Sequence, residues 1–363
     1  MPGGSMDFYY FDAAAHEAPL PEAIAAFEEN LYLANPSSLH EAGRYAKSKL
    51  EEARATIAHC IGADPNEVYF TSGATEACNW AMHCLEAQKK IVCFQPIEHH
   101  AVTSIPFNVN ANTVFIDYAV AHQLANNETG EIFDFPVIRR GCPSDSLFCD
   151  ATAAVGQIPV NFHDLGMGYM AFGAHKFGGL SGIGCMIARE GAPISPLIYG
   201  GGQERDRRGG TESVALACAT AAALEKRCKT MYDDIARITE LRDLFIETIL
   251  REIPQSYVNG PWIVCDATRR LPNNANISFL GVESQSLVLA LSKAGVFASS
   301  SSACTSGNLE GSYVLRAMGY SEERARSAVR FTLPYTVKRA DIEDVCRIVI
   351  ETVKRLRVLS PTI

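Results

Sequence analysis

The sequence predicts an α/β protein, and three observations favour that class. Amphipathic helical patterns alternate with short apolar strand patterns along most of the chain, which is typical of a sheet covered by helices. The 363 residues are 47% hydrophobic and 20% charged, which is enough for one large or two moderate domains. The pattern changes around "PQSYVNG", residues 254–260, so we expect a domain boundary near Ile253.

Before this boundary the patterns predict helices connected by short strands. Residues 38–62 are typical of an amphipathic helix, and the strand pattern at 67–70 turns directly into a helical pattern that ends at 88. Two long helices, 211–233 and 235–253, complete this part. In the part of the chain from residue 89 to residue 210, we expect strands at 91–94, 113–118, 146–151, 168–176 and 183–188. The last two of these flank a glycine-rich turn.

Beyond Ile253 the predicted elements are shorter, and strands and helices are mixed. Strand patterns occupy 275–282, 296–300 and 328–333, and helical patterns occupy 284–295, 313–319 and 339–357.

Composition narrows the class of protein. A net charge of −9 and a pI near 5.5 argue against binding to nucleic acid. No apolar run reaches the ~18 residues that a membrane span needs. The first residues lack the basic and apolar regions of a signal peptide, so we expect a cytoplasmic protein with free thiols. None of the 12 cysteines is in a CxxC pair, and we predict no metal site.

One cysteine has unusual neighbours. Most of the others occur in apolar runs, as packing cysteines do. Cys304 lies in "SSSSACTSG", residues 299–307, where small polar residues favour a loop. We therefore expect an exposed thiol that takes part in chemistry.

A phosphate site is predicted where the strand at 67–70 meets the following helix. In "FTSGATEACN" the backbone N–H groups at the helix start can bind a phosphate, helped by the helix dipole. Gly73 permits close approach, and Thr75 offers a hydroxyl. A simple N-cap is the alternative, and the Walker pattern is absent.

Three further residues follow predicted strands. Lys176, in "AFGAHKFGG", could bind an aldehyde cofactor as a Schiff base, although most lysines are surface residues. Asp150 ends the strand "LFCD" and could pair with a pyridinium nitrogen, or merely cap a helix. His99, in "IEHHAV", could stack on a cofactor ring; a partly buried histidine or a metal ligand are the alternatives.

Together and in this order, the phosphate loop, histidine, aspartate and lysine indicate a pyridoxal 5′-phosphate enzyme. The chain resembles the cysteine desulfurases of the NifS/IscS type, in aminotransferase class V, over nearly its whole length. The segments that carry the resemblance are "NPSSLHEAGR", "FTSGATE", "EHHAV", "NNETG", "CDATAAVGQ", "AHKFGG", "GGGQERDRRGGTES", "SSSSACTSG", "YVLRAMG" and "VRFTL".

The resemblance implies the fold-type-I architecture of pyridoxal phosphate enzymes. The large cofactor-binding domain, 16–252, would have a mixed, mostly parallel sheet. The smaller α+β domain, 1–15 with 253–363, would carry the Cys304 loop.

The resemblance also assigns roles to residues around the cofactor. Lys176 would hold the cofactor as an internal aldimine and shuttle the substrate Cα proton. Asp150 would pair with the ring nitrogen, and His99 would stack on the ring. Contacts to the phosphate and the ring hydroxyl would come from Gly73, Ala74, Thr75, His175 and Asn127.

Substrate and subunit roles follow in the same way. Arg330 would clamp the substrate carboxylate, as suits a bidentate guanidinium, with Asn127 nearby. Thr211 would reach the phosphate of the other subunit, which makes the active unit a homodimer. Cys304 would attack the sulfur of L-cysteine, leaving a persulfide and releasing alanine. His99 or the substrate amine would take its proton. The sulfur would pass to an acceptor protein, for example an iron–sulfur scaffold.

The sequence departs from the family pattern at several positions. Ala153 replaces a glutamine that contacts the ring hydroxyl, and Gly173 replaces a serine on the phosphate. His16 and Glu17 stand where the family has threonines. The interval between His99 and Asn127 is unusually short. These departures keep two alternatives open: a related enzyme acting on selenocysteine or a cysteine analogue, and a non-catalytic paralogue that acts as a binding partner.

Overall fold

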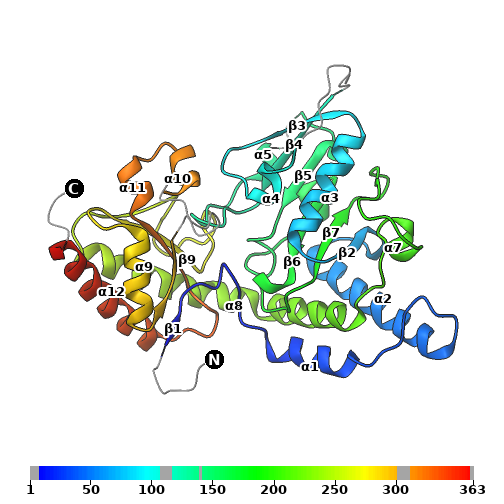
Figure 1. The fold of residues 1–363 in the computed structure, drawn as a ribbon, viewed down its shortest axis with the longest axis horizontal. Helices are drawn as coiled ribbons and strands as arrows, with labels where there is room; N and C mark the ends of the chain where they lie inside the picture. The colour runs from blue at the N-terminus through cyan, green and yellow to red at the C-terminus, as the bar shows by residue number, and fades with distance from the viewer. Residues whose placement is uncertain (1–7, 107–116, 139–140, 301–310, 360–363) are drawn as a thin grey trace. The chain divides into compact units, whose positions relative to one another are not determined.

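A computed structural model describes residues 8–106, 117–138, 141–300 and 311–359 (Figure 1). The chain forms two compact units. The first, here the N-terminal unit, comprises Glu17–Ala125 and Phe133–Met231. The second, here the C-terminal unit, comprises Met1–His16, Asn126–Ile132 and Tyr232–Ile363. The predicted domain limits, 16–252 for the large domain, stay a prediction.

The longest helix belongs to both units. The prediction of two helices at 211–233 and 235–253 is wrong, because one continuous helix, α8, runs from Val214 to Glu252. No glycine or proline occurs in these 39 residues, so nothing in the local sequence interrupts the backbone hydrogen bonds.

The N-terminal unit is built on a six-stranded sheet. Its strands, in spatial order, are β2 (Val68–Thr71), β7 (Gly184–Ala188), β6 (Tyr169–Gly173), β5 (Leu147–Asp150), β4 (Asp117–Gln123) and β3 (Lys90–Phe94). All run parallel except β7, which is antiparallel to both its neighbours. The predicted α/β class with a mixed, mostly parallel sheet is therefore confirmed. Residues 113–116 of the strand predicted at 113–118 lie outside the described residues.

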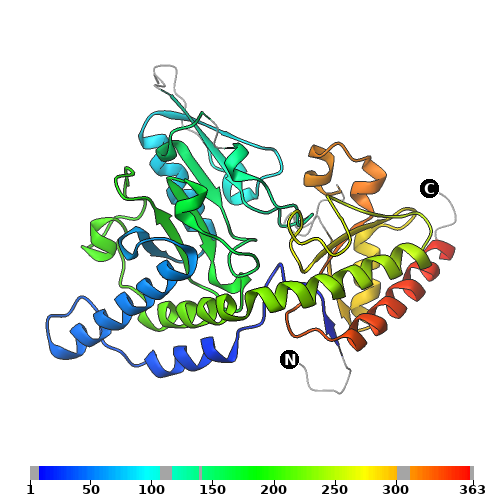
Figure 2. The same ribbon diagram turned by 180° about the vertical axis from the view of Figure 1, so that it is seen from behind.

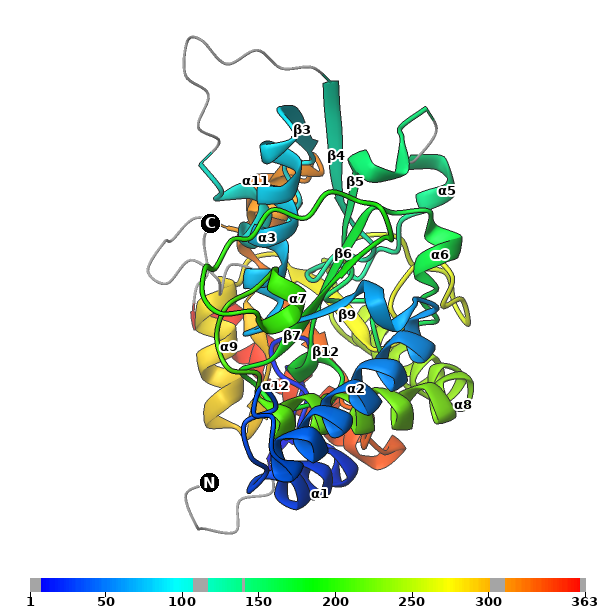
Figure 3. The ribbon, with the colours of Figure 1, turned by 90° about the vertical axis from the view of Figure 1, so that its right-hand side faces the viewer.

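Helices cover the faces of this sheet. Helix α3 (Ala74–Ala87) packs its buried Trp80 and Leu85 with sheet residues such as Phe148 (Figure 3). Elsewhere in the unit, α1 (Pro21–Asn30) lies beside the first half of α8, where Lys226 pairs with Glu22 (Figure 2). The remaining helices are α2 (Glu41–Ile61), α4 (His100–Thr103), α5 (Phe135–Ile138), α6 (Phe162–Leu165) and α7 (Gln203–Asp206), with short 3-10 turns at Pro65–Glu67, Ser144–Ser146 and Ala174–Lys176.

The sheet brings its functional loops to one edge. The five parallel strands end at Thr71, Phe94, Gln123, Asp150 and Gly173. Since the carboxyl ends of parallel strands meet at one edge, the loops that follow them form a common surface, where α/β proteins bind their ligands.

The C-terminal unit is an α+β structure. A four-stranded antiparallel sheet has the order β11 (Ser299–Ser300), β12 (Ala328–Thr332), β9 (Asn274–Phe279) and β8 (Ser256–Val258). Strand β1 (Tyr9–Tyr10) pairs in parallel with β10 (Val296–Phe297). The helices besides α8 are α9 (Ser284–Lys293), α10 (Tyr313–Ala317), α11 (Glu322–Arg326) and α12 (Arg339–Leu359).

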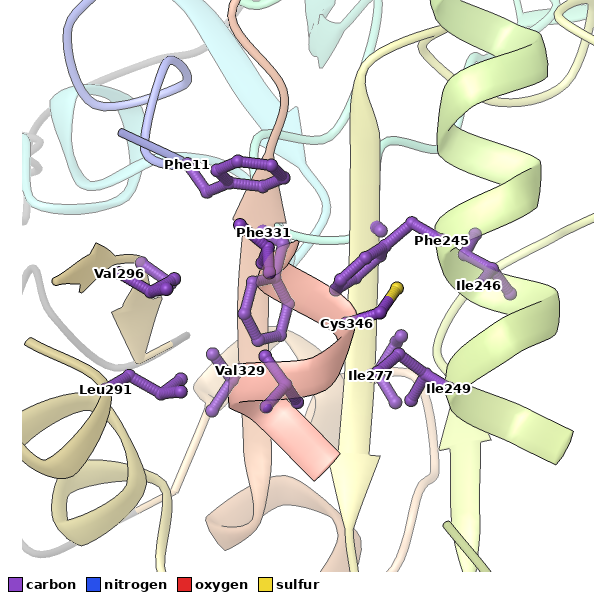
Figure 4. Close-up of a cluster of buried hydrophobic side chains, with 14 of the residues drawn as sticks. Phe11, Phe245, Ile246, Ile249, Ile277, Leu291, Val296, Val329, Phe331 and Cys346 are labelled. Atoms are coloured by element: carbon purple, nitrogen blue, oxygen red, sulfur yellow. The ribbon is translucent and has the colours of Figure 1, made fainter. Parts of the chain in front are cut away.

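The core of the C-terminal unit packs the sheet against α8 and α12. Phe245 from α8 stacks with Phe331 of β12, with ring centroids 5.0 Å apart, and Phe11 lies next to Phe245 (Figure 4). Ile277 and Val329 are also fully buried here. Burial of one such apolar side chain contributes about 1.5–3 kcal/mol to the stability of the fold. Of the helices in the described ranges, none has the length and hydropathy needed to cross a bilayer.

Candidate active site

The start of α3 has the geometry of an anion site. Gly73 is the N-cap and no side chain caps the helix, so the N–H groups of its first turn lack intrahelical partners. Ala74 and Thr75 are the first two helical residues, and Thr75 is exposed. Helix α3 has 14 residues, and the dipole of a helix of this length favours an anion at its N-terminus.

Glycines let two strands approach this helix start closely. A Cβ atom on Gly184 of β7 would lie 2.6 Å from the carbonyl carbon of Gly73, so a side chain there would displace the loop. A Cβ atom on Gly173 of β6 would lie 3.4 Å from the Ala74 nitrogen and 3.4 Å from His175 Cε1. Gly184 thus packs against Gly73, and Gly173 lies next to both Ala74 and His175, so the structure brings the predicted phosphate residues Gly73, Ala74 and His175 to one place.

Gly173→Ser should slow the loss of pyridoxal phosphate on dialysis by about 10-fold. The new hydroxyl would lie beside the Ala74 N–H and could donate to the phosphate, and a charge-assisted hydrogen bond of this kind contributes about 1.5–3 kcal/mol. The backbone at Gly173 is extended, at φ −122° and ψ 139°, so serine adopts it without backbone strain, and its Cβ would lie 3.3 Å from Ala74 Cβ, which has to shift by a few tenths of an ångström. Gly173→Ala adds only the Cβ atom and measures the effect of crowding. Equal retention in the serine and alanine variants would contradict this prediction.

Asp150 lies at the end of β5 and is 6% exposed. Its Oδ1 accepts from the Thr152 backbone N–H at 2.9 Å, and the buried thiol of Cys78 on α3 also hydrogen-bonds its carboxylate. Burial raises the pKa of neighbouring Glu98 to about 8, and the charge of Asp150 adds to that rise. Glu98 is therefore largely protonated at neutral pH and does not act as a second carboxylate here.

His99 is half-buried at the N-terminus of α4. Its Nδ1 accepts from the Ala101 N–H at 3.1 Å, which leaves the proton of a neutral ring on Nε2. Burial lowers its pKa, and the Lys176 charge lowers it further against the opposing effect of Asp150. His99, Asp150 and Lys176 therefore lie within electrostatic reach of one another in the N-terminal unit. The imidazole is therefore neutral at physiological pH.

Lys176 ends a 3-10 turn that directly follows β6. The turn is fixed from two sides: Gln157 donates to the carbonyl of Lys176 at 2.8 Å, and the Glu17 N–H donates to the carbonyl of His175 at 3.0 Å. Glu17 is buried, and burial raises its pKa to about 7. Near Asp150 in the chain, the hydroxyl oxygen of Thr152 is buried and has no hydrogen-bond partner among the described residues.

Two predicted substrate residues meet in the C-terminal unit. Arg330 of β12 donates from Nη1 to the Asn127 carbonyl at 3.0 Å and from Nη2 to Asp12 at 2.9 Å. Among the described residues, Arg330 Nε and Asn127 Oδ1 are buried and have no partner. A donor and an acceptor that are desolvated without partners are costly, so this geometry favours a bound polar ligand.

The last two predicted residues stand apart from these groups. Thr211 is exposed in the segment before α8. Cys304 lies outside the described residues, and so does most of the loop predicted around it.

Comparisons with known proteins identify the family. The profile described as "Aminotransferase class-V" matches residues 9–119 and 110–345. The chain belongs to the class-V aminotransferase family. "Cysteine desulfurase IscS" of Dictyoglomus turgidum is 35% identical over 97% of this chain and 96% of its own. "IscS-like cysteine desulfurase" of Mycobacterium tuberculosis is 35% identical over 96% of this chain and 97% of its own.

Solved structures agree with this assignment to the class-V family. A NifS-like protein from Rickettsia africae superposes with a TM-score of 0.83, at 26% identity, over 97% of this chain and 99% of its own. Another structure, titled "NIFS-LIKE PROTEIN", also superposes with a TM-score of 0.83. It is 25% identical, and the match covers 96% of this chain and 100% of its own. The predicted resemblance to cysteine desulfurases and the fold-type-I architecture are confirmed. Members of the class-V family depend on pyridoxal phosphate. The predictions that this protein is an enzyme and that it uses this cofactor are therefore also confirmed.

The sequence patterns did not predict two ion pairs that hold the loops around the start of α3 and the segment before α8. Glu76 on α3 accepts from Arg208 at 2.8 and 2.9 Å and from the Ser72 N–H at 2.7 Å, so it ties the phosphate loop to the segment that contains Thr211. The segment "GGGQERDRRGGTES" contains Arg208, and the glutamate belongs to "FTSGATE". Both motifs were recognised, but their pairing is not visible in the sequence.

A second pair is fully buried. Glu204 of α7 accepts two hydrogen bonds from Arg54 of α2, at 2.8 and 2.9 Å, and one from the Phe70 N–H of β2 at 3.0 Å. Arg54 also donates to the Val68 carbonyl at 2.7 Å. Glu204, with φ 45°, is the first of three successive non-glycine residues with positive φ, a costly conformation that the pair holds in place.

Proposed function

We propose that this protein is a pyridoxal phosphate-dependent cysteine desulfurase. It converts L-cysteine to L-alanine and transfers the sulfur to its own Cys304 as a persulfide. The observation that carries this proposal is the meeting of His99, Asp150 and Lys176 beside the uncapped start of α3. The names of the relatives support the same activity.

The residues of the N-terminal unit fit the cofactor. Gly73, Ala74, Thr75 and His175 would hold its phosphate, and Asp150 would face the ring nitrogen. The cofactor supplies an electron sink for the substrate carbanion. Lys176 takes the proton from the substrate Cα and returns it. Neutral His99 would stack on the ring and add no positive charge beside the ring nitrogen that Asp150 would face.

The C-terminal unit supplies the carboxylate site. Arg330 Nε has no hydrogen-bond partner among the described residues, so it would donate to the substrate carboxylate. Asp12 holds Arg330 from the other side, and Ser299 fixes Asp12 at 2.9 Å. Asn127 Oδ1, also without a partner among the described residues, would accept from a donor on the substrate. Together these contacts orient the substrate Cα.

The Cys304 thiolate attacks the substrate sulfur: an S–S bond forms as the substrate Cβ–S bond breaks, and the electron pair goes to the substrate carbon, which takes up a proton and leaves as L-alanine. The persulfide on Cys304 then passes its outer sulfur to an acceptor protein. An iron–sulfur scaffold is one acceptor of suitable chemistry. The proton leaves Cys304 through His99 or the substrate amine. The alternatives, a selenocysteine enzyme and a non-catalytic paralogue, are not favoured: the relatives are named as cysteine desulfurases, and Lys176 and Cys304 are both present.

Cys304→Ser should bind pyridoxal phosphate normally but lose nearly all sulfide release from L-cysteine. Serine cannot accept sulfur, whereas neither cofactor binding nor substrate binding uses the thiol. The measurements are the visible absorption spectrum for the cofactor, and alanine and sulfide production under reducing conditions. Cys265→Ser removes an exposed cysteine of the C-terminal unit and should keep the parent rate. Parental turnover in Cys304→Ser would show that the proposed mechanism is wrong.

We also propose a homodimer whose sites are completed by Thr211 of the partner. Support comes from a group of exposed apolar side chains on the same unit. Tyr32 is 92% exposed, Leu39 88% and Tyr199 81%. Large exposed apolar side chains are typical of protein–protein interfaces. Tyr32 and Leu39 both lie in the segment between α1 and α2, and Tyr199 directly precedes the segment that contains Thr211.

Leu39→Glu should shift the protein toward the monomer in analytical ultracentrifugation and lower its cofactor retention. A charge at the centre of an apolar interface cannot be desolvated cheaply. Leu289→Glu, at a 65% exposed position on α9, changes charge equally and should leave the oligomeric state unchanged. A parent protein that is monomeric and active at micromolar concentration would refute the dimer.

Two broader predictions remain proposals. We propose a cytoplasmic location, supported by the absence of disulfides among the described cysteines, a state that reducing compartments maintain. We also propose that 16–252 acts as the cofactor-binding domain and that 1–15 with 253–363 acts as the domain of the Cys304 loop.

A further inference from the structure

Two cysteines outside the candidate site lie next to each other in the N-terminal unit. Cys60 is in the last turn of α2, and Cys228 is on α8. The Cys228 Sγ lies 3.7 Å from the Cys60 carbonyl oxygen, and the two thiols hydrogen-bond each other. Both side chains are half-buried, so small molecules in solution can reach them.

The packing of α2 against α8 places these thiols together. A second contact of the same kind lies along the same two helices, where Cys218 Sγ of α8 is 3.8 Å from the Lys49 carbonyl of α2. The two contacts show that α2 and α8 run side by side over about three turns. Cys218 therefore has the same kind of environment as Cys228 but faces a lysine rather than a cysteine.

The pair is chemically unequal. The hydrogen bond from Cys60 stabilises a Cys228 thiolate, which lowers the pKa of Cys228 and raises that of Cys60. The neighbouring Arg227 charge also lowers the pKa of Cys228. Because the thiolate is the reactive form, Cys228 is the nucleophile of the pair and Cys60 is the resolving thiol.

We propose that Cys60 and Cys228 form a reversible disulfide when the protein meets a hydroperoxide. The Cys228 thiolate attacks the peroxide, forming an S–O bond as the O–O bond breaks, and becomes a sulfenic acid while the peroxide leaves as an alcohol or water. The Cys60 sulfur then attacks the Cys228 sulfur. An S–S bond forms, the S–O bond breaks, and the hydroxide takes the Cys60 proton and leaves as water. The two thiols are oxidised by two electrons, and the peroxide is reduced by two.

The position of Cys60 makes this closure feasible. It precedes the left-handed Gly62 that ends α2, so only the last turn of a helix has to adjust to disulfide geometry. The bond would close a loop of 168 residues and join α2 to α8. A disulfide in a reducing compartment is usually transient and redox-sensing, which fits a pair that thiol reductants can reach.

The test uses the full-length protein loaded with pyridoxal phosphate, without L-cysteine. It is treated with a few equivalents of hydrogen peroxide, blocked with a thiol reagent and mapped by mass spectrometry without reduction. We expect a peptide pair joined through Cys60 and Cys228 that disappears after dithiothreitol. Cys218→Ser is the matched control and should form the cross-link to the same extent as the parent.

The single variants separate this pair from other thiols. In Cys60→Ser the sulfenic acid on Cys228 should persist and be trapped by dimedone at a level several-fold above the parent, because the resolving thiol is gone. Unmodified Cys60 and Cys228 in treated parent protein would overturn the proposal. So would oxidation of Cys228 in the parent to a sulfinic acid without a cross-link to Cys60. The cross-link in the parent protein decides whether the proposal holds, so the proposal can be tested even if a variant folds poorly.

Discussion

Lys176→Ala should lower the turnover of L-cysteine by at least about 10²–10⁴-fold, the contribution of a positioned general acid–base group. The lysine ends a turn fixed by Gln157 and lies within electrostatic reach of His99. In the mechanism proposed above, its removal takes away both the attachment point of the cofactor and the group that moves the Cα proton. The measurement is alanine production at saturating cofactor.

A chemical readout separates this role from a structural one. In the parent protein, borohydride should fix pyridoxal phosphate to the peptide that contains Lys176, and Lys176→Ala should show no such product. Lys226→Ala removes an exposed lysine of α8 and should retain both the product and the rate. Cofactor fixed to another lysine in the parent would contradict the assigned role.

Arg54→Ala should destabilise the protein by about 3–5 kcal/mol, the usual cost of removing one partner of a buried ion pair. Both side chains of the Arg54–Glu204 pair are 1% exposed, so the glutamate would keep a buried charge without its main counter-ion. Because α7 would lose its anchor on β2, the segment that contains Thr211 should loosen as well. Urea unfolding of the apoprotein measures the first effect, and cofactor retention measures the second.

Two comparisons test the origin of this effect. Lys47→Ala breaks an exposed pair with Glu51 on the same helix and should change stability little. The double variant Arg54→Leu with Glu204→Leu should lose less than the sum of the two single leucine variants, because it strands no charge. Additive losses would mean that the pair acts only through the packing of its side chains.

The positions of the three proposed cofactor residues in the fold could be predicted from the sequence because each lies at the end of a strand or within five residues after it. His99, Asp150 and Lys176 are far apart in the chain, but the parallel strands before them end at one edge of the sheet. Local patterns also located α3 and its glycine. The strand order and the family motifs were therefore enough to assemble this half of the site.

Other features depend on pairings that no local pattern contains. Arg54 meets Glu204 across 150 residues, and Arg330 meets Asp12 across 318. A charged residue in a helix is normally solvated, so its burial is visible only when the partner is placed. The continuous helix α8 was divided because its apolar pattern weakens around Asp234, although its backbone has no reason to break there.

The segments of the C-terminal unit are made at very different times during synthesis. Tyr9 of β1 donates its hydroxyl to Asp344 of α12 at 2.9 Å, 335 residues later in the chain. At about 5–20 residues per second, a ribosome needs about 20–70 s to make the chain between them. The N-terminal unit, by contrast, is complete once Met231 has emerged. For most of that interval the nascent β1 has no Val296 to pair with, and its apolar neighbour Phe11 has no Phe331 to cover it. A chaperone that shields the first residues of the growing chain would therefore raise the yield of folded protein. Circular permutation that moves these residues to the C-terminus would remove the delay between the synthesis of β1 and that of its partners.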